Sequence, residues 1–157
     1  MLSSSFFHYV YRIHILFLQS ILETIQFFKE GEPETEYAIG KVTMNKVSDR
    51  FAAKDQKREL KAYYVTFHDG ARTRLHYHES DQILIATEGI GFVEIVKRIE
   101  EASDGKYSFV IEDSTEFKDG ESVIIPAGKI HWHGAKKGSK DKFSHIAILR
   151  NTPTFWL

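Results

Sequence analysis

The amino-acid sequence predicts an all-β fold, either a sandwich or a barrel, preceded by an N-terminal helix. From Glu36 onward, short segments rich in Val, Ile, Tyr and Phe follow one another, separated by Gly, Asp, Ser and Lys, which is typical of strands and their turns. The spacing between these segments is too short for crossover helices, so the sheets should be antiparallel. A chain of 157 residues is long enough for one such domain.

Residues 1–33 are predicted to form a helical extension, and residues 34–157 the β domain. Apolar residues recur at alternating spacings of three and four, as on one face of an amphipathic helix; they are Tyr11, Ile15, Leu18, Leu22 and Ile25. Gly31 and Pro33 would end the helix. Because polar residues such as Arg12 and Glu23 interrupt this apolar stretch, we do not expect it to be a membrane span or a signal peptide.

Eight segments within the β domain have the composition of strands. They are residues 37–47, 61–67, 72–77, 82–87, 91–99, 107–112, 122–125 and 145–150, and a further strand is expected to begin at His131. Residues 103–106, which read Ser-Asp-Gly-Lys, are a hairpin signal. The polar residues 51–59 are predicted to be a loop.

Composition excludes several classes of function. The formal net charge is -1, which argues against binding to nucleic acid or to an anionic membrane. The chain has no cysteine, so disulfides, thiolate metal sites and thiol catalysis are excluded, and we expect a cytoplasmic protein. Any metal ion would have to be bound by histidine, carboxylate or amide side chains.

Two segments concentrate the histidines. In the first, His76 and His78 alternate along a strand-like segment, so their side chains should point to the same face. Gln82 follows a polar turn and can reach the same point. In the second, Pro126-Ala-Gly128 forces a reversal before His131, and His133 shares the face of His131. His145 lies on a strand that could return past the same cavity.

These two segments resemble the two motifs of the cupin superfamily. Gly70-x5-His76-x-His78-x3-Gln82-x6-Gly89 is similar to the first motif, and Gly120-x5-Pro126-x-Gly128-x2-His131 is similar to the second. The chain differs from the common pattern in having Gln82 in place of glutamate and Ala135 in place of asparagine. Local strings around both motifs also resemble small single-domain cupins that include bacterial manganese-dependent hydroxynitrile lyases. The resemblance covers about residues 36–150.

The resemblance implies a jelly-roll β-barrel that holds one divalent transition metal ion with His76, His78, Gln82 and His131. Imidazole and amide donors suit manganese, iron, nickel, copper or zinc, and the resemblance favours manganese. Because Gln82 replaces a carboxylate, the ligands carry no negative charge, and the ion would attract anions or acidify a bound water more strongly. The alternative for Gln82 is to orient a water or a histidine beside the ligands.

The function expected from this resemblance is that of a metal-dependent enzyme acting on a small oxygenated or aromatic molecule. The most specific expectation is hydroxynitrile lyase chemistry, with His133 or His145 as general base. The alternative for both residues is a structural role as hydrogen-bonded core histidines. A cupin dioxygenase and a non-catalytic binding module are the alternatives for the protein. A homodimer or higher homo-oligomer is expected, because the first helix and Phe155-Trp156-Leu157 would expose apolar surface.

Overall fold

The computed structural model describes residues 32–47, 59–101 and 107–157, which form strands and no helix. The predicted N-terminal helix, the loop at 51–58 and the hairpin turn at 103–106 lie outside the described residues. Within them, no helix is long and apolar enough to cross a membrane. The all-β prediction is therefore confirmed for the described part of the chain.

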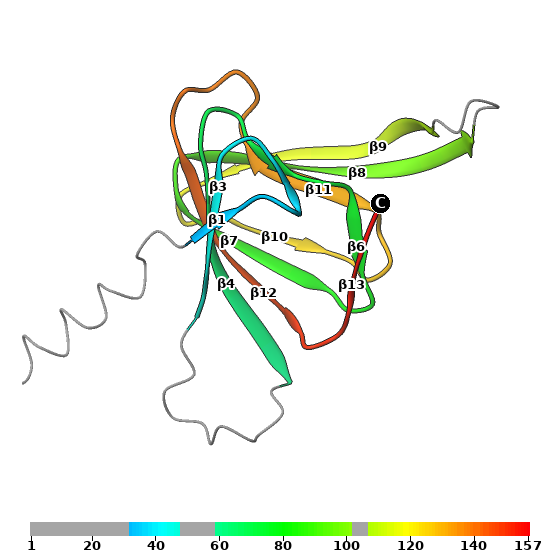
Figure 1. Cartoon of the computed structure of the whole chain (residues 1–157), viewed down its shortest axis with the longest axis horizontal. Helices are drawn as coiled ribbons and strands as arrows, with labels where there is room; N and C mark the ends of the chain where they lie inside the picture. The colour runs from blue at the N-terminus through cyan, green and yellow to red at the C-terminus, as the bar shows by residue number, and fades with distance from the viewer. Residues whose placement is uncertain (1–31, 48–58, 102–106) are drawn as a thin grey trace, which may run out of the picture.

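The strands form two antiparallel sheets that curl over one core (Figure 1). The first sheet has the order β1-β3-β4-β12-β7-β10, in which these strands are Glu32–Glu34, Val42–Lys46, Leu60–Phe67, Phe143–Arg150, Gln82–Glu88 and Ser122–Ile125. The second has the order β13-β6-β11-β5-β2, in which these strands are Thr154–Trp156, His76–His78, His131–Ala135, Arg72–Thr73 and Ala38–Ile39. β8 (Ile90–Glu101) pairs with β11, and β9 (Tyr107–Lys118) pairs with β8.

The structure corrects several predicted strand boundaries. Residues 37–47 form two strands in different sheets, β2 and β3, because the chain turns at Gly40, which has a φ of 90°. Residues 72–77 are likewise divided between β5 and β6. The predicted strand 107–112 extends to Lys118, and β1 and β13 were not predicted as strands. β2 and β13 pair with strands that lie far away in the sequence, β5 and β6, whereas β1 pairs with β3 and the extension of β9 pairs with the neighbouring β8.

The long stretch between the two histidine segments forms a hairpin. β8 and β9 each contain 12 residues, whereas only Gly91 to Ile95 of β8 pair with β11. The remainder of the hairpin extends away from the sheets (Figure 1). Val96 is still buried, but residues 108–116 of β9 are exposed, so the outer part of this hairpin lengthens the protein with little contribution to the core.

Alternation along the inner strands produces a core with an apolar part and a histidine-rich part. Phe67, Leu84 and Phe143 are fully buried, and the ring centroids of Phe143 and Phe117 lie 5.2 Å apart. On β11, the buried side chains include His131, His133 and Ala135. The same pleat that buries aliphatic residues therefore turns the histidines of β6, β11 and β12 inward.

Gly134 allows two strands of the second sheet to approach closely. A Cβ atom at this position would lie 2.3 Å from the backbone oxygen of Ala71, and this oxygen accepts a hydrogen bond from the Ala135 N–H at 3.0 Å. We expect Gly134→Ala to lower the free energy of unfolding by ~3 kcal/mol, the upper part of the range for overpacking. Urea denaturation measures it, with Ser122→Ala at an exposed position as the control. Equal stability of the two variants would contradict the prediction.

Candidate metal centre

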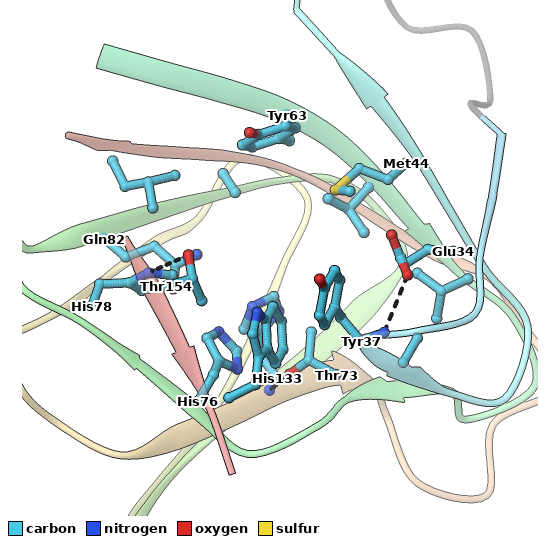
Figure 2. Close-up of a pocket in the computed structure, with 16 residues that line it drawn as sticks. Glu34, Tyr37, Met44, Tyr63, Thr73, His76, His78, Gln82, His133 and Thr154 are labelled. Atoms are coloured by element: carbon cyan, nitrogen blue, oxygen red, sulfur yellow. Dashed lines mark hydrogen bonds between the residues drawn. The ribbon is translucent and has the colours of Figure 1, made fainter. Parts of the chain in front are cut away.

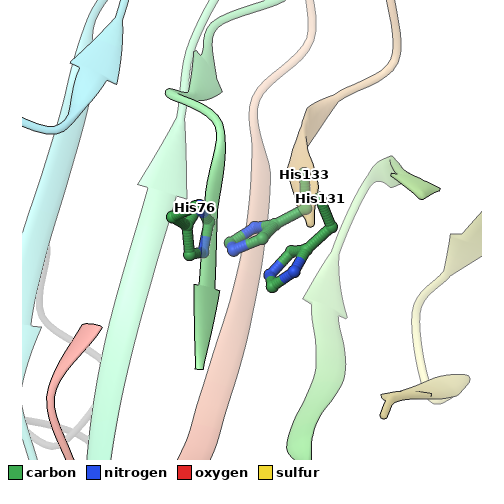
Figure 3. A group of neighbouring side chains, drawn as sticks. All are labelled: His76, His131 and His133. Carbon is green, nitrogen blue, oxygen red and sulfur yellow. The ribbon is translucent and has the colours of Figure 1, made fainter. Parts of the chain in front are cut away.

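Three histidines from two neighbouring strands converge inside the barrel. His131 on β11 pairs directly with His76 on β6, and their ring centroids are 4.2 Å apart. One ligand nitrogen from each of His76, His131 and His133 lies within 4.8 Å of the others (Figure 3). All three side chains are buried. This cluster could hold a metal ion.

Backbone carbonyls determine which nitrogen of two of these histidines is free. The Nδ1 of His76 donates to the Arg74 carbonyl at 2.8 Å, and the Nδ1 of His131 donates to the Lys129 carbonyl at 2.8 Å. A neutral imidazole carries only one N–H, so the Nε2 atom of each ring has a lone pair. These hydrogen bonds therefore hold each imidazole with an Nε2 lone pair that could bind a metal ion, as the outer partners of ligand histidines usually do.

The amide of Gln82 lies against one of these lone pairs. Its terminal atom is 3.0 Å from the Nε2 of His131, so the amide can donate an N–H to this nitrogen or, with its oxygen, bind a cation beside it. Imidazole nitrogens and an amide oxygen are donors that suit a divalent transition metal ion, and these residues therefore fit one.

His78 lies on the same strand and faces the same interior. Its Nδ1 is 3.2 Å from the hydroxyl oxygen of Thr154 on β13, and its Nε2 is buried without a hydrogen-bond partner among the described residues. A buried polar atom without a partner costs free energy. His78 thus has a nitrogen available for a ligand, beside the amide of Gln82 (Figure 2).

Burial keeps the candidate ligands neutral. Burial lowers the pKa of His131 to about 4, against the opposing effect of its hydrogen bond to the Lys129 carbonyl. Burial also lowers the pKa of His78 to about 4, and the nearby Gln82 amide opposes this shift. The pKa of His76 falls well below its usual range, because of burial and then the neighbouring His131. At pH 7 all three imidazoles can therefore bind a metal ion without first losing a proton.

A cavity of about 230 Å³ lies beside the histidines. His76, His78, Gln82 and His133 line it, and Figure 2 shows them on the side opposite Tyr63 and Met44. Most of the other lining residues are apolar or aromatic, and they include Val42, Val65, Leu149, Tyr37 and Trp156. The cavity is therefore largely apolar, with histidine nitrogens and the Gln82 amide grouped on one wall.

A family model for cupins matches residues 31–153 of the chain. This chain is a cupin. The match includes both histidine segments and every strand from β1 to β12. The resemblance inferred from the two motifs is therefore confirmed, and so is the cupin fold.

Comparisons with individual cupins connect this chain with enzymes and with proteins of undefined activity. The chain is 33% identical over 84 residues to an (R)-mandelonitrile lyase from Granulicella tundricola. That match covers 54% of this chain and 52% of the relative, so the chain spans about half the length of the curated relative it matches.

Solved structures support the same fold. A cupin-like protein from Thermotoga maritima is 29% identical, with a TM-score of 0.62 over 83% of this chain and 86% of that chain. An oxalate oxidase is 18% identical, with a TM-score of 0.57 over 82% of this chain and 60% of that chain. The second likeness concerns the fold alone.

The predicted site residues of this cupin fall into two groups. His76, His78, Gln82 and His133 line the cavity, and His131 contacts Gln82. His145 does not line the cavity; its ring is stacked on Phe67 at 5.5 Å and lies edge-on to His133 at 5.0 Å. His145 thus lies behind His133, and both of its ring nitrogens are buried without hydrogen-bond partners among the described residues. The ligand and catalytic roles of all six residues stay predictions.

The sequence analysis missed several residues that shape the site. Trp156 was expected on an exposed apolar face, but it lines the cavity and stacks on Tyr37 with ring centroids 4.4 Å apart. Thr73 accepts a hydrogen bond from the His133 N–H at 3.1 Å. If residues 154–156 had been predicted as a strand, alternation would have placed the side chains of Phe155 and Trp156 on opposite faces. The sequence did not indicate a strand at β13.

Proposed function

We propose that this cupin is a metal-dependent enzyme of the hydroxynitrile lyase type. The observation that carries the proposal is the convergence of His76, His131 and His133, which are all buried and place one nitrogen each within 4.8 Å of the others. Such a cluster of neutral imidazoles can hold a metal ion. The similarity to an (R)-mandelonitrile lyase supports the lyase chemistry.

His76, His78, Gln82 and His131 would hold the ion, which we propose to be manganese. When bound, the ion would supply a Lewis acid that polarises a substrate oxygen. None of these side chains is negatively charged at pH 7. The site therefore favours substrates or products that carry a developing negative charge.

His133 is the proposed general base. Its ring lines the cavity, and its pKa lies well below the usual range, because of burial and then the neighbouring His145. The neutral imidazole takes the proton from the hydroxyl of a cyanohydrin. The bond to the nitrile carbon then breaks, its electron pair leaves with cyanide, and an aldehyde forms. The proton passes from His133 to cyanide, which leaves as hydrogen cyanide.

The cavity favours an uncharged substrate with an apolar group. None of the described residues that line it is lysine or arginine. Its one carboxylate, that of Glu34, accepts hydrogen bonds from the backbone N–H groups of Glu36 at 2.8 Å and Tyr37 at 3.1 Å. For a dianionic substrate, the metal would therefore be the only positive charge among the described residues of the cavity, with no lysine or arginine to pair with the second negative charge. An aromatic ring, in contrast, would contact Tyr37 and Trp156.

Metal analysis and an activity assay test this function. Protein purified without chelator should contain about one metal ion per chain, and manganese-loaded protein should release benzaldehyde from mandelonitrile at a rate that falls to background after chelation. Oxygen consumption with catechols or thiols, without mandelonitrile cleavage, would instead favour a dioxygenase. Protein that cannot be loaded with manganese, iron, nickel or zinc would contradict both activities and leave the non-catalytic alternative.

The assembly and location of this cupin stay predictions. A homodimer remains the proposed state, although the apolar segment 1–31 expected to contribute to it lies outside the described residues. Phe155 and Leu157 do keep exposed apolar surface, 36% and 53% respectively. Gel filtration of the full chain tests the dimer, and the expected cytoplasmic location rests on composition alone.

A further inference from the structure

The short C-terminal strand runs beside the strand that carries two of the candidate ligands. β13 pairs antiparallel with β6, so that Thr154 lies opposite His78 and Trp156 lies opposite His76. The Leu157 N–H extends this pairing by donating to the Leu75 carbonyl at 2.9 Å. β13 lies at the edge of the second sheet, and β6 is its only strand partner among the described residues. It therefore contacts the site from the side and does not hold central strands together.

His78 differs from the other two histidines in the group that binds its Nδ1 atom. His76 and His131 are held by backbone carbonyls, which only accept hydrogen bonds and so force the proton onto Nδ1. His78 is held by the hydroxyl of Thr154, which can donate or accept. The Nε2 of His78 has a free lone pair only when Nδ1–H donates to Thr154.

Trp156 supports the second ligand of the same strand. Its ring centroid lies 4.5 Å from that of His76 and 4.4 Å from that of Tyr37. The His76 ring is therefore covered on one side by a side chain from β13. Both candidate ligands of β6 contact residues of the three-residue strand β13, and Figure 2 shows Thr154 beside His78.

We propose that β13 is a strap that positions the metal ligands, and that Thr154 is the residue through which it sets metal affinity. The proposal rests on the metal site described above. Thr154 accepts the Nδ1–H of His78 and thereby presents the Nε2 of His78 to the metal, while Trp156 restricts rotation of the His76 ring. Removal of the hydroxyl leaves the Nδ1 of His78 without a hydrogen-bond partner among the described residues to fix its tautomer.

The experiment compares two Thr→Val variants in the same segment by calorimetric titration of metal-free protein with Mn²⁺. Thr154→Val should weaken Mn²⁺ binding by about 10- to 100-fold, the usual effect of losing an outer partner of a ligand histidine. Thr152→Val is the matched control, because the Thr152 Oγ1 is buried without a hydrogen-bond partner among the described residues. It should bind Mn²⁺ within about twofold of the parent. Thr154→Ser should restore most of the affinity.

The outcomes separate the strap from the metal site itself. Parent and Thr152→Val proteins that bind Mn²⁺ support the site, and an unchanged affinity in Thr154→Val would then overturn the role of Thr154. A parent protein that binds no metal would contradict the proposed function first. Thermal unfolding of the metal-free variants excludes a general loss of structure: we expect Thr154→Val and Thr152→Val to unfold within a few degrees of each other. A weakened affinity that Thr154→Ser fails to restore would also count against the hydroxyl.

Discussion

Replacing His131 with alanine should abolish stoichiometric metal binding and, with it, the proposed lyase activity. His131 contacts Gln82 through Nε2 and is fixed by a carbonyl through Nδ1, so its loss removes a ligand and separates Gln82 from its neighbour. We expect Mn²⁺ affinity to fall by more than about 100-fold, beyond the effect of losing an outer partner. Calorimetric titration and metal analysis after gel filtration measure it.

His68→Ala is the matched control for this prediction. His68 follows β4 and does not line the cavity, so its variant should bind Mn²⁺ as the parent does. Equal affinity in His131→Ala and His68→Ala would mean that the metal site is elsewhere. An equal loss in both variants would instead indicate a general effect on folding.

His133→Ala distinguishes a fourth ligand from a general base. The geometry places His133 within reach of a metal held by His76 and His131, whereas the cupin resemblance assigns the ligand positions to His78 and Gln82. With His133 as the base, the variant keeps its metal while turnover of mandelonitrile falls by about 10²- to 10⁴-fold. If this variant loses its metal, His133 is a metal ligand and not the general base.

Metal-free protein should become much less stable as the pH falls below 6.5. Histidines in an unfolded chain bind protons with a pKa near 6.5, whereas burial lowers the pKa of His131 to about 4 and that of His145 to about 3 in the folded protein. Between these values the unfolded chain binds protons that the folded chain does not. Their contribution to stability is therefore fully present above pH 6.5 and is lost as the pH falls toward 4.

The slope expected from these two residues is about 3 kcal/mol per pH unit near pH 5, at about 1.4 kcal/mol per proton. His78, whose pKa is lowered to about 4, adds to it. Urea denaturation between pH 7.5 and pH 5 measures this slope. Replacing His145 with leucine removes one titrating group and should reduce the slope by about 1.4 kcal/mol per pH unit. A stability that stays constant from pH 7 to pH 5 would contradict the prediction.

Much of the fold and the candidate site follows from local sequence patterns. His76 and His78 face the same side because strand side chains alternate, and the turn at Pro126-Ala-Gly128 leads directly into β11. The spacing of these residues predicted that histidines from both motifs lie together, but the cluster formed by single ligand nitrogens contains His76, His131 and His133, whereas the predicted ligand set contained His78 and Gln82 in place of His133. His145 was predicted to lie on a strand that could return past the same cavity; β12 does place it in the interior, alternating with Ala147 and Leu149, but behind the cavity.

The structural features that the sequence did not predict depend on contacts with other segments, which local patterns do not specify. Residues 37–47 have the composition of one continuous strand. However, the backbone of Gly40 packs closely against Ala71: a Cβ atom at position 40 would lie 2.8 Å from the Ala71 Cβ. This packing directs β2 and β3 into separate sheets. β13 was missed because three residues are too few to show a period, and its role depends on β6, which lies more than seventy residues earlier.

The pairing of distant segments also affects how this protein folds. The hydroxyls of Thr66 on β4 and Ser144 on β12 lie 3.0 Å apart across a sequence separation of 78 residues, and β13 joins β6 across a similar distance. Proteins dominated by such non-local pairings fold in milliseconds to seconds, because long loops must close before contacts form. During synthesis β6 is made long before β11 and β13. We therefore expect its histidines to be exposed on the nascent chain and to acquire their final geometry only after the last strand has docked.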